Sequence, residues 1–196
     1  MAHVTKEKKA VFKKNTFYHI YNKSAGNELM FRDGENYRFF MQRWSEYLDD
    51  YTDVFAYCLM PDHFHFLIRL KKNIKGDIHS LAGNAFRNFF ASYTLSFNKY
   101  WNRTGTLFAH SYKRIPVERT DYLSALIRYI HENPVEHKFV DDCRLWKYSS
   151  YRAILSRKDT KVKRNEVLTL LGGEEEYRNL HSAQFDWSSI DHLIVA

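Results

Sequence analysis

Residues 54–70 read VFAYCLMPDHFHFLIRL, and this stretch decides the fold. Two short apolar and aromatic runs flank Pro61-Asp62, a pair typical of a tight turn, so the pattern predicts two strands joined by a hairpin. Alternate side chains of a strand share a face, so His63 and His65 point the same way. The intervening positions form an apolar face: Phe64, Phe66, Ile68 and Leu70. The second strand therefore offers an apolar face for burial and a second face that carries two imidazoles.

Hydrophobic periodicity outside this hairpin predicts further strands and helices, since apolar residues recur every second position or every third and fourth. The predicted elements are a strand over Thr16–Asn22, a helix from its cap Asp33 to about Asp50, a helix from Ile78 to about Tyr100, a strand over Lys113–Glu118, and a helix capped by Thr120 that stops at Pro134. This order, with short connections, predicts an α+β protein in which helices pack on an antiparallel sheet, in a ferredoxin-like arrangement.

The length of 196 residues suits one principal domain. We expect a basic N-terminal leader over 1–14, a main domain over 15–155 and a weakly helical extension over 156–196. No run of about 18 apolar residues occurs, so we expect no membrane span.

The net charge of +7 favours a polyanionic partner. The two cysteines, Cys58 and Cys143, form no C-x-x-C pair, which fits a reducing cytosol and a cytoplasmic protein.

The histidine pair suggests chemistry, because His63 and His65 on one strand face can hold a metal ion. The alternative is a pair of surface histidines on a half-exposed strand. A third ligand can come from the last predicted helix, where Tyr129 and Asn133 are four residues apart and share a face beside the leucine stripe. The alternative there is a packing tyrosine and a polar residue at a helix end.

Two motifs together carry a family resemblance: YCLMPDHFHFLI (residues 57–68) and LIRYIHENPVEH (residues 126–137). The chain resembles the single-tyrosine HUH transposases, and within them the REP-associated tyrosine transposases, which act on palindromic hairpins in bacterial chromosomes. The resemblance extends to FYHIYNK, GTLFAHSYKRIPVE and WKYSSY, and covers about residues 15 to 152.

The resemblance implies roles for four residues. His63, His65 and Asn133 would hold Mg²⁺ or Mn²⁺, and Tyr129 would attack DNA to give a 5′-phosphotyrosine link and a free 3′-OH. A free tyrosine has a pKa near 10, so Tyr129 needs help to act at neutral pH. Related insertion-sequence enzymes often carry Gln at the position of Asn133. His19 and His110 are candidate neighbours of the site, or else hydrogen-bonded strand and loop residues.

DNA, as single strand and hairpin, is the expected partner, and both a homodimer and a monomer are compatible with the sequence. The candidate DNA-binding residues are Lys71, Lys72, Arg87, Arg103, Lys113 and Arg114. Basic side chains neutralise phosphates, although charged runs also form solvated faces. Two alternatives to a DNA strand transferase are a domesticated hairpin-binding protein that rarely cuts and a zinc-dependent hydrolase supported only by the His-x-His pair.

Overall fold

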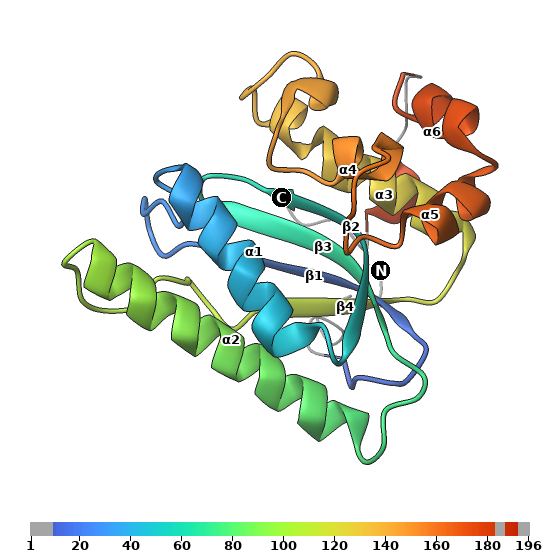
Figure 1. Ribbon diagram of the computed structural model, residues 1–196. Helices are drawn as coiled ribbons and strands as arrows, with labels where there is room; N and C mark the ends of the chain where they lie inside the picture. Colours follow the sequence, from blue (N-terminus) through green and yellow to red (C-terminus); the bar gives the residue numbers. More distant parts are fainter. Residues whose placement is uncertain (1–9, 183–186, 192–196) are drawn as a thin grey trace.

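The fold is built on one four-stranded antiparallel sheet, described by a computed structural model that covers residues 10–182 and 187–191 (Figure 1). The strands are β1 (Phe17–Lys23), β2 (Thr52–Leu59), β3 (His63–Leu70) and β4 (Lys113–Val117). They lie in the order β2-β3-β1-β4, with every neighbouring pair antiparallel. The predicted hairpin around Pro61-Asp62 is therefore confirmed, as is the α+β class.

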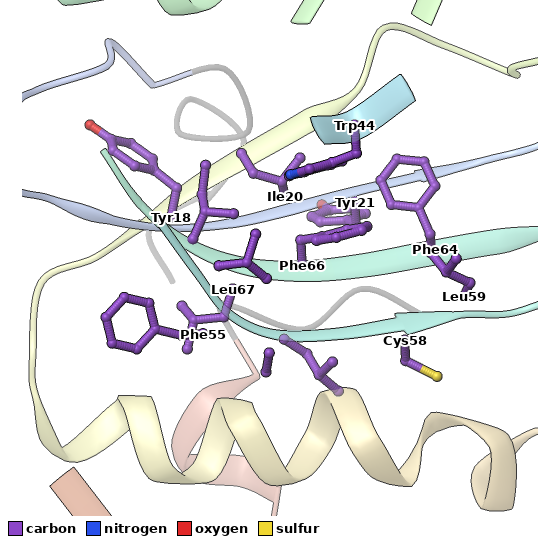
Figure 2. Close-up of a cluster of buried hydrophobic side chains, with 14 of the residues drawn as sticks. Tyr18, Ile20, Tyr21, Trp44, Phe55, Cys58, Leu59, Phe64, Phe66 and Leu67 are labelled. Atoms are coloured by element: carbon purple, nitrogen blue, oxygen red, sulfur yellow. The ribbon is translucent and has the colours of Figure 1, made fainter. Parts of the chain in front are cut away.

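Helices cover both faces of the sheet (Figure 1). Helices α1 (Gly34–Leu48) and α2 (Ile78–Tyr100) pack together on one face, and α3 (Asp121–Glu136) packs against β2 and β3 on the other. The apolar face of β3 meets α1, where the rings of Trp44 and Phe66 stack with centroids 3.8 Å apart (Figure 2). The alternation of β3 thus separates a dense aromatic core from the face that carries the histidines.

Helix caps follow the local sequence in two of the three long helices. Asp33 accepts a hydrogen bond from the Asn36 amide at 2.9 Å, as predicted, and Asp77 caps α2 in the same way. Thr120 occupies the N-cap position of α3, but its side chain makes no capping hydrogen bond, so the prediction of a side-chain cap there is wrong.

Helix α3 continues past its predicted stop. Pro134 lies inside it, and the helix ends at Glu136 with the His137 amide donating to the Asn133 carbonyl at 3.0 Å. Proline lacks an amide donor but has a helical φ, so near a C-terminus the helix loses a single hydrogen bond and persists. The prediction that Pro134 stops the helix is wrong for this reason.

The C-terminal extension packs beside α3. It contains α5 (Arg164–Leu171) and α6 (Glu174–Leu180), preceded by α4 (Tyr151–Leu155), with 3-10 turns at Cys143–Leu145 and Trp187–Ile190. Tyr177 of α6 is fully buried, and its hydroxyl lies 3.3 Å from Nδ1 of His131 on α3. That imidazole also contacts His181 at 2.9 Å and Ser150 at 2.7 Å. A buried polar cluster therefore joins the extension to α3.

The expected N-terminal leader lies partly outside the described residues, which begin at residue 10. Phe12 is buried, its amide donates to Nδ1 of His79 at 3.2 Å, and its ring stacks on Phe86. Within the described part of the chain, no helix is long and apolar enough to cross a membrane.

The packing of α6 on α3 makes a stability prediction. Tyr177→Ala removes a fully buried ring and leaves a cavity, so the free energy of unfolding should fall by about 3 to 5 kcal/mol. Tyr100→Ala is the control, because Tyr100 is 67% exposed and its loss should change stability by about 0.5 kcal/mol or less. Urea unfolding measures both. Equal effects of the two substitutions would contradict this packing.

Candidate functional site

The sheet places His63 and His65 on the face that α3 covers. Their rings lie 5.4 Å apart, and His65 is buried opposite Tyr21 of β1 and Cys58 of β2. Directly paired residues of neighbouring strands share a face, so Tyr21 stands in the same row as His65.

Helix α3 brings the other two predicted residues to the histidines. The ring of Tyr129 meets the ring of His65 edge-on, with centroids 5.6 Å apart, and Oδ1 of Asn133 lies 3.3 Å from Nε2 of His63. Asn133 also donates from Nδ2 to the Tyr129 carbonyl at 2.9 Å. All four predicted site residues therefore lie together, from two elements far apart in the chain.

The outer ring nitrogens of both histidines have hydrogen-bond partners. Nδ1 of His63 lies 2.8 Å from the Asp62 carboxylate, and Nδ1 of His65 lies 2.9 Å from Nε2 of His19. Metal-binding histidines characteristically use one nitrogen for such a partner and present the other to the ion. The arrangement therefore fixes both rings with Nε2 left for a ligand.

The contact between His63 and Asn133 tests whether a cation fits. Because Nδ2 of Asn133 donates to Tyr129, Oδ1 faces His63 as an acceptor. When Nδ1 of His63 donates to Asp62, Nε2 also presents a lone pair. Two acceptors 3.3 Å apart repel each other unless a cation, either a proton on His63 or a metal ion, lies between them. Neighbouring ligands of an octahedral Mg²⁺ are about 3 Å apart, so the donors fit such an ion.

Carboxylates and thiols do not complete this donor set. Among the residues that the structure describes, no three His, Cys, Asp or Glu side chains are grouped so that they could hold a metal ion. A metal at this place would therefore depend on the amide oxygen of Asn133 as its third protein ligand.

Burial shifts the ionisation of the site. It raises the pKa of Tyr129, an effect that a hydrogen bond from the Asn133 side chain opposes and the charge of Glu136 reinforces. Burial and the neighbouring imidazoles lower the pKa of His65 well below its usual range, which keeps this ring neutral at neutral pH. The site thus holds a neutral imidazole, as metal binding requires, beside a protonated phenol.

Residues of the site that sequence reasoning missed include Asp62 and Tyr21. Asp62, which orients His63, was part of the turn motif, and its position directly before His63 was the available signal. Tyr21 shares a face of β1 with His19, but its place beside His65 depends on the pairing of β1 with β3. Among the residues that the structure describes, the buried Tyr21 hydroxyl has no hydrogen-bond partner.

The predicted DNA-binding residues fall into separate groups. Lys113 pairs with Tyr21 and stands on the face of the histidines, whereas Arg87 and Arg114 line a cavity on the α2 side. Lys71 and Lys72 follow the end of β3 opposite to His63, about 25 Å away.

Arg103 is engaged within the fold. Its guanidinium pairs with Glu28 at 3.1 Å and donates to Asn98 at 2.6 Å. The structure therefore brings only Lys113 to the histidine face.

A family model described as "Transposase IS200 like" matches residues 3–133. Among solved structures, the chain is similar to a REP-associated tyrosine transposase bound to a REP hairpin, with a TM-score of 0.58 and 15% identity over 76% of this chain and 83% of the other. No curated protein matches. The predicted transposase resemblance is confirmed at the family level, and the structural likeness confirms the fold.

The buried hydroxyl of Tyr21 leads to a prediction about how stability depends on pH. Tyr21→Phe should leave the free energy of unfolding at pH 7 unchanged or raised by up to about 1 kcal/mol, because an unpaired buried hydroxyl contributes no favourable contact. Burial and the charge of Tyr129 raise the pKa of Tyr21 to about 12. Above pH 10 the unfolded chain releases this proton first, so stability should fall by about 1.4 kcal/mol per pH unit until pH 12.

The measurement is urea unfolding of the wild type and Tyr21→Phe at pH 7 and near pH 11. The variant should lose less stability than the wild type between the two values. A variant that is clearly less stable at pH 7 would show that the hydroxyl has a partner.

Proposed function

Because this chain belongs to the IS200-like transposase family, we propose that it is a metal-dependent single-strand DNA endonuclease and strand transferase that acts at DNA hairpins. The observation that carries the proposal is the meeting of Tyr129 with His63, His65 and Asn133 across two distant elements. In this proposal Tyr129 is the nucleophile and the other three residues are the metal ligands.

The proposed reaction is a transesterification. The Tyr129 phenol oxygen attacks the phosphorus of a single-stranded phosphodiester, and the bond from phosphorus to the 3′ oxygen breaks. The phenol loses one proton, and the leaving 3′ oxygen gains one to become a 3′-OH. The product is a 5′-phosphotyrosine and a free 3′ end. One phosphodiester replaces another, so rejoining to a second 3′-OH needs no nucleotide cofactor.

His63, His65 and Asn133 would hold the divalent ion, Mg²⁺ or Mn²⁺, between the sheet and α3. When bound, the ion neutralises charge that develops on the non-bridging phosphate oxygens. Asp62 and His19 support this role, since each fixes the ring of one ligand through its Nδ1.

In the free protein, Tyr129 lies beside the histidines but keeps its phenol proton. It is only 9% exposed, and burial keeps its pKa above the usual value, so at neutral pH it carries its proton. We expect proton loss to accompany attack rather than precede it, because a free phenolate would be disfavoured in this buried position.

The nucleophile is tested by the covalent adduct. Wild-type protein incubated with a labelled hairpin oligonucleotide and Mn²⁺ should form an adduct that survives denaturation, and Tyr129→Phe should form none. Tyr122→Phe is the matched control, because Tyr122 lies on the same helix about two turns before Tyr129. An adduct in Tyr129→Phe would refute the assignment. Tight hairpin binding without an adduct in any divalent metal would favour the alternative of a domesticated hairpin-binding protein.

The ligand set is tested by metal affinity. Asp62→Asn should weaken Mn²⁺ binding about tenfold, because the neutral amide holds the His63 ring less firmly. Asn133→Ala removes a ligand and should weaken binding at least as much. Asp50→Asn, an exposed carboxylate in the turn before β2, is the control. Isothermal titration calorimetry measures all three, and unchanged affinity in Asn133→Ala would exclude its amide as a ligand.

A further inference from the structure

A cavity of about 460 Å³ lies on the other side of the sheet, between α2 and residues 108–114. Its wall includes Gly83, Arg87, Phe90, Phe108, Tyr112 and Arg114. Arg114 pairs with Ile20, whereas Lys113, one residue earlier, pairs with Tyr21 on the histidine face. The cavity is therefore separated from the Tyr129 site by the thickness of the sheet.

The wall combines flat rings with fixed positive charge. The Phe90 ring contacts the rings of Phe108 and Tyr112 at 5.1 and 5.2 Å. Arg114 is held in place, since it donates to the Ala10 carbonyl at 2.5 Å and to the Tyr112 hydroxyl at 2.9 Å. Arg87 is exposed on α2, and the described residues that line the cavity include no carboxylate. This chemistry complements a ligand that has an aromatic ring and a negative charge.

Gly83 is an independent sign of a ligand. It lies in the interior of α2, where glycine weakens a helix. A Cβ added to Gly83 would meet no atom of the described residues within 4 Å, and its φ is not left-handed, so neither their packing nor backbone geometry requires glycine there. The missing side chain leaves open the part of the cavity that another residue would fill.

We propose that this cavity binds an unpaired nucleotide of the DNA substrate, with the base against the aromatic wall and the phosphate near Arg87 and Arg114. DNA as the ligand rests on the proposed function. Stacking on aromatic side chains beside a positive groove is how single strands are bound without a duplex. β4 is an edge strand, so DNA that passes around it meets Arg114 on one face and Lys113 on the other.

The experiment measures fluorescence anisotropy of a labelled single strand of about ten nucleotides and of the corresponding duplex. Gly83→Leu fills the cavity and should weaken single-strand binding about tenfold, with duplex binding unchanged. Its melting temperature should not fall, because leucine is a better helix former than glycine.

Arg87→Gln should lower the salt dependence of single-strand binding by about one phosphate contact. Lys99→Gln, an equal charge change on the same helix, is the control.

Unchanged single-strand binding in Gly83→Leu would overturn the proposal, and so would an equal loss of duplex binding. Thymidine monophosphate that competes as well as the oligonucleotide would show a free-nucleotide site instead. The adduct assay separates the two proposals. If the wild type forms the adduct but Gly83→Leu binds the single strand normally, only the cavity proposal is refuted. If the predicted binding pattern is found but no adduct forms, only the proposed cleavage is refuted.

Discussion

The packing of α3 on the histidine face of the sheet is the contact on which the site depends. Leu123, Leu126 and Ile130 bury one stripe of the helix, which leaves Tyr129 and Asn133 on its flank toward β3. The strand register is equally strict, because a slip of one residue would turn both histidines into the aromatic core. The four residues meet within one chain.

The sequence predicted the elements whose signals are local. The alternation of β3, the Asp33 cap and the helical stripe of α3 all follow from neighbouring residues, and all are present. Local rules failed at Pro134, where the tertiary packing of α3 and the cost of only one lost hydrogen bond allowed the helix to continue. Tyr21 was missed because its place beside His65 is set by sheet order, which no local pattern encodes.

The positions of charged residues in the fold were also not predictable from local sequence. Lys71 and Lys72 are close to the histidines in sequence, yet an extended strand carries them to its far end. Arg87 and Arg114 are distant in sequence, yet α2 and β4 place them around one cavity. Proximity along the chain is thus a poor guide to a binding surface wherever a strand or long helix intervenes, and the topology decides which charges act together.

Tyr21 and Gly83 both oppose local stability, and each lies beside residues that we propose to bind the DNA or its metal ion. Tyr21 buries a hydroxyl beside His65 that has no partner in the described part of the chain, and Gly83 weakens the interior of α2 where a side chain would fit freely. Phenylalanine and alanine would suit the free fold better at these positions. Sequences often depart from consistency with their fold where a site must stay open or polar for a ligand. These departures therefore favour ligand contact on both faces of the sheet, joined by the exposed edge of β4.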